Sequence, residues 1–149
     1  MQTAVVIMAR LEIDDFKDLD EAFKRIAEMP DAVKDKALRA MADVAAPEIK
    51  STGESMGVRD RESSTHILDS IKLSKPKTTA SGGYMDINFS GNRTRNGITT
   101  RNDEIAYVNE YGRNDQDARP FIGTAMNKAA DKIAEAGAKV LWDYIEKNF

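Results

Sequence analysis

One short segment of this chain has the residue pattern of a serine nucleophile. Gly53-Glu-Ser-Met-Gly57 matches Gly-x-Ser-x-Gly, the strained turn that exposes a catalytic serine between a buried strand and a helix. Here a helical pattern precedes the segment and a charged stretch follows it. The lone histidine, His66, comes too soon afterwards for the acid that precedes histidine in that fold. The pattern therefore does not predict a hydrolase.

Metal and phosphate chemistry have little support in the sequence. The chain has one histidine and no cysteine, so an ordinary zinc site would need three carboxylates. The acidic groups at 14–15, 18–21 and 115–117 lack the alternating ligands and the glycine of an EF-hand. The glycines between 82 and 97 do not form a phosphate-binding loop ahead of a helix. We therefore predict no catalytic residue, no metal, no cofactor and no small-molecule substrate.

An arginine cluster is better suited to binding than to catalysis. Arg93 and Arg95 precede Asn96-Gly97, and Arg101 follows it. Asn-Gly is a strong signal for a type I′ hairpin, because both residues tolerate a positive φ. Arginines on such a tip can contact DNA phosphates or a neighbour's carboxylates. The simpler alternative is a solvated tip, since exposed charge is usual there.

A second group of residues lies just ahead of the C-terminal helical pattern. Ile105, Val108 and Tyr111 are spaced three apart, so about one helical turn could bury them together. Gly112 suits a left-handed residue that ends this turn. These residues alone describe a corner between a loop and a helix.

Pro120 and its neighbours complete this corner. Proline favours the first turn of a helix, and it restricts Arg119 to an extended conformation. We expect the Arg119 guanidinium to point away from the new helix and Phe121 to dock on the core. Arginines in such places usually serve structure or interfaces.

The bulk composition is that of a globular protein. The 149 residues are 41% hydrophobic and 32% charged, which indicates one domain over 1–149 with a working core. The net charge of −3 argues against a dedicated nucleic-acid binder. The absence of cysteine excludes a disulfide framework and fits a reducing cytoplasm. The apolar run 4–9 is too short for a membrane span and lacks the basic leader of a signal peptide.

The predicted elements begin with a strand and two helices. Residues 3–13 are apolar and β-branched and then alternate, which indicates a strand whose second half lies at a sheet edge. Helical spacing over 19–26 predicts a helix that Met29-Pro30 closes. Asp31 is a candidate cap for a second helix, and Pro47 is expected to kink or end it.

A loop and a small sheet follow. Residues 51–65 are polar and contain two glycines, which predicts a mobile surface loop. Residues 67–73 indicate a helical turn that runs into a strand. After a further loop, residues 84–89 alternate as in a half-buried strand. The hairpin at Asn96-Gly97 is expected to join this strand region to 98–100.

A long C-terminal helix completes the prediction. Its apolar positions step by three and four residues: Ile122, Met126, Ala129, Ile133, Ala136, Val140 and Tyr144. The predicted fold is α+β, with an N-terminal strand, two helices, a small antiparallel sheet with a hairpin near Asn96-Gly97, and this helix packed on the sheet.

Two segments just ahead of the C-terminal helix resemble the tail-component (tail completion or neck) family of long-tailed bacteriophages. Asn109-Glu-Tyr-Gly112 is similar to its Glu-aromatic-Gly element, and Ala118-Arg-Pro-Phe121 matches its second element residue for residue. Three upstream segments resemble the family's Ala-Pro, Thr-Gly and Leu-x-x-Ser-Ile in the same order: Ala46-Pro47, Thr52-Gly53 and Ile67-Leu-Asp-Ser-Ile71. The chain departs from the family at Arg113, where threonine is frequent, and in a longer interval between 53 and 67.

The resemblance implies a virion structural protein at the head–tail junction, made in the host cytoplasm. Such proteins assemble as rings on the tail's sixfold axis, so the implied partners are further copies, with a hexamer as the candidate size, and neighbouring tail or connector proteins. Three residues become candidate charge partners between subunits: Glu110, Arg113 and Arg119. Three others would shape the corner beneath them: Tyr111, Pro120 and Phe121.

The arginine hairpin has two possible partners under this resemblance. Arg93, Arg95 and Arg101 would reach a partner ring or DNA in the lumen. The alternative is a small cytoplasmic nucleic-acid-binding module that uses hairpin 93–101.

Overall fold

The computed structural model describes residues 8–13, 29–58, 67–80 and 82–148. Its elements, in chain order, are β1 (Ala9–Ile13), α2 (Asp31–Ser55), the 3-10 helix η1 (Ile67–Ser70), β2 (Ile71–Leu73), β3 (Lys77–Thr79), β4 (Gly82–Phe89), β5 (Asn92–Arg95), β6 (Ile98–Arg101), α3 (Asn102–Tyr111) and α4 (Phe121–Asn148). The predicted first helix, the start of the first strand and residues 59–65 of the predicted 51–65 loop lie outside the described residues.

Strand β4 is the centre of an antiparallel sheet. β1 pairs along one side of it, from Ala9 opposite Ile87 to Ile13 opposite Gly83. β2 and β3 pair with different halves of its other side. Among the described strands β1 therefore lies at a sheet edge, as the sequence predicted.

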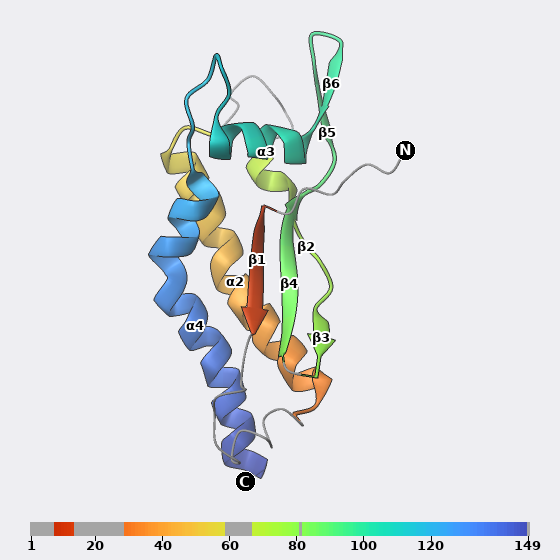
Figure 1. Ribbon diagram of the computed structural model, residues 1–149, viewed down its shortest axis with the longest axis vertical. Coiled ribbons are helices and arrows are strands. Elements are labelled where there is room, and N and C mark those ends of the chain that lie inside the picture. The colour runs from red at the N-terminus through yellow and green to blue at the C-terminus, as the bar shows by residue number, and fades with distance from the viewer. Residues whose placement is uncertain (1–7, 14–28, 59–66, 81, 149) are drawn as a thin grey trace.

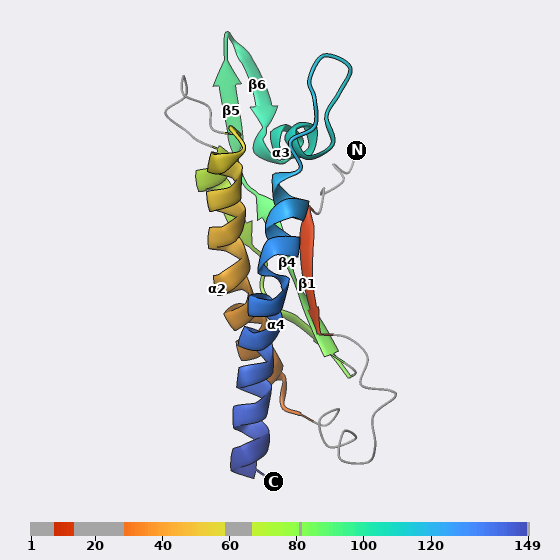
Figure 2. The same ribbon diagram turned by 90° about the vertical axis from the view of Figure 1, so that its left-hand side faces the viewer.

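The two long helices run side by side along the molecule (Figures 1 and 2). Helix α2 packs on β4 and β1, and α4 packs chiefly on α2. The prediction that the C-terminal helix packs on the sheet is therefore wrong, because α2 lies on the sheet and offers α4 its apolar partner. The alternation in β4 buries Met85, Ile87 and Phe89 toward this core. The α+β class and the long C-terminal helix are confirmed. None of the described helices has both the length and the apolar character that crossing a bilayer requires.

Helix α2 is longer than predicted. Pro47 lies inside it on an exposed position, and the helix continues to Ser55. The buried face continues past Pro47 with Ile49 and Thr52, so tertiary packing offsets the hydrogen bond that proline removes. The predicted 51–65 loop is therefore wrong at its start, where the chain is helical.

The arginine hairpin forms a sheet of its own. Asn96 and Gly97 have φ values of 52° and 77°, which the predicted type I′ turn requires. The turn joins β5 to β6, however, and not β4 to β6. Between β4 and β5 the chain passes through Gly91, whose φ of 80° redirects the backbone away from the main sheet. The hairpin projects beyond the body of the molecule (Figure 1).

Helix α4 starts where Pro120 ends the preceding loop. The Pro120 carbonyl accepts a hydrogen bond from the Thr124 N–H at 3.0 Å, so the proline precedes the helix by one residue. Of the predicted stripe, Ile122, Ala129 and Ile133 are buried, and the later members are partly exposed.

Candidate functional site

Helix α3 lies across one end of the helix pair and carries a mostly polar buried face (Figure 1). Its buried residues are Asn102, Asp103, Ala106, Asn109 and Glu110. Tyr111 is 63% exposed, so the prediction that it is buried with Ile105 and Val108 is wrong. Residues six apart on an α-helix are rotated by about 240°, so Ile105 and Tyr111 cannot share one narrow face. Tyr111 instead contacts the partly exposed Tyr107, with ring centroids 4.7 Å apart.

Glu110 holds the start of α4. Its two carboxylate oxygens accept hydrogen bonds from the backbone N–H groups of Ile122 at 2.8 Å and Gly123 at 2.9 Å. The first N–H groups of a helix have no partner within it, and the helix dipole favours negative charge there. The Glu110 carboxylate is therefore already hydrogen-bonded within its own chain. The sequence did not predict this, because Glu110 lies outside α4 and well before its start.

Gly112 allows the chain to leave α3 sharply. Its φ of 75° and ψ of 177° belong to a region that is open almost only to glycine. A Cβ at this position would lie 2.9 Å from the Ala118 nitrogen and 3.0 Å from the Gln116 carbonyl oxygen. The positive φ expected of a left-handed Gly112 is confirmed, but its ψ is extended rather than left-handed helical. The close approach of the returning chain is a second reason for glycine.

The segment after Gly112 folds back onto α3. Arg113 and Gln116 exchange two backbone hydrogen bonds, of 2.9 and 3.1 Å. The Gln116 side chain donates to the side-chain oxygen of Asn109 at 3.3 Å. The Arg119 backbone N–H donates to the Asn109 carbonyl. The loop is therefore attached to α3 at two points, which fixes the direction in which Arg119 leaves it.

The Arg119 side chain connects this loop to the end of α2. Its guanidinium donates to the Gly57 carbonyl at 3.0 Å. The Gly53–Gly57 segment lies at the C-terminal end of α2, so a helix and not a strand leads into it. It therefore lacks the strand–turn–helix geometry of a serine nucleophile.

Phe121 is completely buried beneath the corner. Its ring meets that of Phe89 edge-on, with centroids 5.9 Å apart. A Cβ on Gly53 would lie 3.1 Å from the Phe121 ring and 2.6 Å from a Leu68 methyl. Gly53 thus lets α2, η1 and α4 approach closely. The segments 52–53, 67–71 and 118–121, which carry the family resemblance, meet at this point.

A pocket of about 360 Å³ lies between the hairpin, α3, the 113–119 loop and the end of α2. Arg93, Arg113 and Arg119 all line it, although they belong to two groups that the sequence kept separate. Arg95 and Arg101 do not line it. Arg101 instead forms a close ion pair with Asp103.

The remaining lining is mixed in character. Glu104 is the acid among the lining residues that the structure describes, and the amides of Asn109 and Gln116 add hydrogen-bonding groups. Val58 and Val108 provide apolar surface. The sequence gave no reason to select these residues, because their common position depends on how α3 and the loop fold together.

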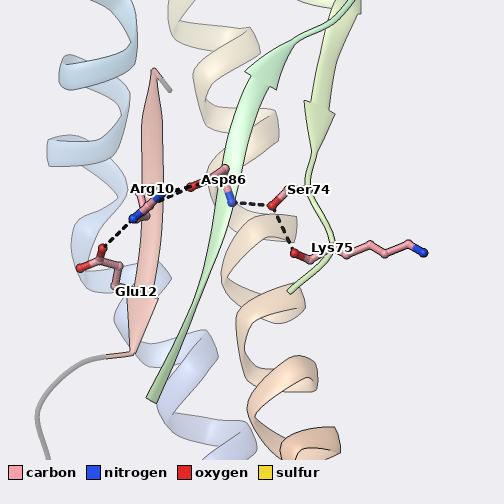
Figure 3. A network of polar contacts seen from close by, with 5 residues as sticks. All are labelled: Arg10, Glu12, Ser74, Lys75 and Asp86. Atoms are coloured by element: carbon pink, nitrogen blue, oxygen red, sulfur yellow. Dashed lines mark hydrogen bonds and ion pairs between the residues drawn. The ribbon is translucent and has the colours of Figure 1, made fainter. Parts of the chain in front are cut away.

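A second polar cluster lies on the sheet (Figure 3). The Arg10 Nε donates to Asp86 at 2.8 Å, and the guanidinium lies 4.2 Å from the Tyr84 ring centroid. The side-chain hydrogen bond to Asp86 raises the pKa of Arg10. The Asp86 backbone N–H donates to the Ser74 hydroxyl at 2.8 Å, which ties β4 to the end of β2. We call the set of Arg10, Glu12, Tyr84 and Asp86 the outer sheet face.

Acidic side chains also stabilise contacts away from the pocket. Lys50 of α2 forms an ion pair with Asp69 of η1 at 2.8 Å, and this hydrogen bond raises the pKa of Lys50. Within the described ranges, histidine and acidic side chains do not gather in a group of three or more that could hold a metal ion.

The chain matches no protein-family model, no curated protein and no solved structure to which it was compared. Its function must therefore be argued from its own residues and their geometry.

Proposed function

We propose that this protein is a non-enzymatic structural protein of a bacteriophage virion. It acts at the head–tail junction, in tail completion or head–tail joining, through ring-type assembly. Its partners are further copies of itself and neighbouring tail or connector proteins. It is made in the bacterial host cytoplasm and becomes part of the virion.

The observation that carries this proposal is the packing of the segments on which the resemblance rests. Gly53, Leu68 and Phe121 come from three of these segments and are in contact. Glu110 comes from a fourth and caps the helix that Phe121 begins. Because these segments pack together in one corner, a change in one of them affects the others. Their occurrence in the family's order is therefore better explained by a shared structure than by chance.

The residues of this corner divide into two roles under the proposal. Glu110 and Phe121 hold it from within, where both are buried. Tyr111, Arg113 and Arg119 are exposed and available to a neighbouring subunit, and Pro120 lies exposed between loop and helix. Repeated contacts between this corner and a different surface of the next copy would close into a ring when their rotation permits.

Light scattering behind size exclusion tests this proposal. A closed oligomer near six subunits, stable over a wide concentration range, is the expected result. Arg119→Ala should reduce its fraction, whereas Arg39→Ala, which removes an exposed arginine from α2, should not. A chain that stays monomeric at every concentration would contradict self-assembly.

The projecting hairpin supports a second candidate, a small nucleic-acid-binding module. It places Arg93 and Arg95 on a two-stranded sheet beyond the body of the protein (Figure 2). The pairing of Arg101 with Asp103 and the net charge of −3 weigh against it. Binding to duplex DNA that weakens steeply with salt, and that Arg95→Gln reduces, would favour this candidate.

A further inference from the structure

The arginine-lined pocket has the chemistry of a binding site for an anion. Arg93 reaches it from the hairpin, and Arg113 and Arg119 reach it from the loop ahead of α4. Three guanidinium groups around one cavity present a fork geometry that suits carboxylate and phosphate oxygens. Among the described lining residues a single acid, Glu104, faces them. A positive cavity of this kind attracts a negatively charged group.

The contacts that Arg113 and Arg119 already make leave capacity for a ligand. Arg113 pairs with Asp115 at 2.5 Å, but their side chains are 58% and 73% exposed. Exposed ion pairs contribute little free energy, so an incoming carboxylate can replace Asp115 at small cost. The bond from Arg119 to Gly57 uses one nitrogen of a group that carries five N–H donors.

The shape and lining of the pocket favour a peptide carboxylate over nucleic acid. A cavity of about 360 Å³ accommodates one or two side chains, whereas a duplex backbone binds along an open surface. Glu104 would repel a polyanion but can accept an N–H from a peptide backbone. Val58 and Val108 provide apolar contact for the methylene groups of a glutamate and its neighbours.

We infer that this pocket binds a glutamate or aspartate side chain of an acidic peptide segment from a neighbouring protein. The proposed function is the basis only for placing that neighbour in the virion. The chemistry of recognition depends on the three arginines, with the amides of Asn109 and Gln116 orienting the bound segment.

Fluorescence anisotropy with a matched pair of labelled peptides tests this inference. One peptide is acetyl-Gly-Leu-Glu-Glu-Leu-Gly-amide, and the other has glutamine in place of both glutamates. The full chain should bind the acidic peptide about tenfold more tightly or better, because charge-assisted hydrogen bonds are the stronger ones. Arg93→Gln and Arg113→Gln should each weaken its binding by about tenfold.

Matched controls separate the pocket from general charge effects. Arg39→Gln makes the same change of charge on an exposed position of α2 and should leave binding unchanged. Arg113 is exposed, so Arg113→Gln should keep the melting temperature and circular dichroism of the parent. Arg93 is half-buried, and its variant counts only if both measurements also match the parent. If one arginine variant fails to fold, the other still decides the result.

Three outcomes would overturn the inference. One is equal binding of the two peptides, and another is binding that the pocket arginines do not affect. The third is tighter, arginine-dependent binding of a duplex of about 12 base pairs, which would make the pocket part of a nucleic-acid site.

Failure of this inference is distinct from failure of the proposed function. A ring that forms by light scattering without peptide binding removes the pocket and leaves assembly standing. If a permanently monomeric chain binds the peptide, the pocket inference stands and the proposed ring assembly falls.

Discussion

Two carboxylates of this chain accept hydrogen bonds in very different surroundings. Glu110 is 9% exposed and binds two backbone N–H groups at the start of α4. Asp86 binds the guanidinium of Arg10 on the outer sheet face, where the Asp86 side chain is 15% exposed and the Arg10 side chain 36% exposed. Without Glu110, two N–H groups at a buried helix end would lose their acceptor. Without Asp86, Arg10 would be hydrated.

This difference shows where polar groups determine the structure. In the α3–α4 corner, which we define as residues 102–123, water cannot easily replace a lost partner. On the outer sheet face water reaches the Arg10 guanidinium, and ion pairs with one exposed partner are accordingly weak. We therefore expect the corner to be sensitive to single substitutions and the outer sheet face to be tolerant.

Phe121 should be the most sensitive position of the corner. Phe121→Ala removes a fully buried ring and leaves a cavity between Phe89 and Gly53, which should cost about 4 kcal/mol of unfolding free energy. Urea denaturation followed by circular dichroism measures this loss. Phe121→Leu keeps most of the volume and should cost about 1.5 kcal/mol or less. Equal costs for the two variants would show that the ring does not fill the core.

Glu110 comes next in expected effect. Glu110→Ala leaves the Ile122 and Gly123 N–H groups without their acceptor and should destabilise the protein by about 3 kcal/mol. Glu110→Gln keeps one acceptor oxygen and should cost roughly half as much. Thermal unfolding of the three proteins in one buffer provides the measurement. A Glu110→Ala variant as stable as the parent would remove the contrast between Glu110 and Asp86.

Gly112 tests the backbone of the same corner. Gly112→Ala combines an unfavourable φ with a Cβ placed 2.9 Å from a backbone nitrogen, so we expect a loss of about 2 kcal/mol. Gly97→Ala is the matched control, because Gly97 also has a positive φ but open space around its Cβ position. Its cost should be nearer about 1 kcal/mol, from the left-handed conformation alone. Equal losses in denaturant titrations would mean that the close contact at Gly112 relaxes freely.

The outer sheet face should show the smallest effect. Asp86→Asn keeps the side-chain shape and removes the ion pair with Arg10, so the melting temperature should change by less than about 2 °C. Added salt should shrink this difference further, because it screens exposed charges. A drop as large as that of Glu110→Ala would show that the two carboxylates are equivalent after all.

The pH dependence of this pair follows from the raised pKa of Arg10. A base whose pKa rises on folding stabilises the protein at every pH below its unfolded pKa, and the effect is lost only as pH rises through the folded value. For arginine this lies beyond ordinary buffers. The difference between the parent and Asp86→Asn should therefore be constant between about pH 6 and about pH 9.

Local sequence patterns predicted correctly those elements whose conformation follows from the preferences of neighbouring residues. The alternation of Met85, Ile87 and Phe89 predicted which face of β4 is buried, and Asn96-Gly97 predicted the turn. The sequence prediction was wrong where tertiary packing outweighs the local preference of a residue. Pro47 does not end α2, because the buried face of the helix continues beyond it.

The candidate site was predicted in pieces. The sequence selected Arg93 for its hairpin and Arg113 and Arg119 for their corner, but it could not place the two groups around one pocket. Glu110 was a candidate surface charge, and its engagement with α4 was not foreseen. The packing of α3 against the hairpin, the 113–119 loop and the start of α4 decides which of these side chains meet.

The sequence by itself determined the class of the fold, its turn at Asn96-Gly97, the positive φ of Gly112 and where along the chain the last helix begins. These depend on periodicity and on the allowed φ and ψ of single residues, which are local properties. The tertiary structure alone decided that Glu110 caps α4, that Gly53 admits Phe121, and that three arginines share a pocket. Such contacts join residues far apart in the chain, and their free energy exists only once hydrophobic burial has brought the elements together.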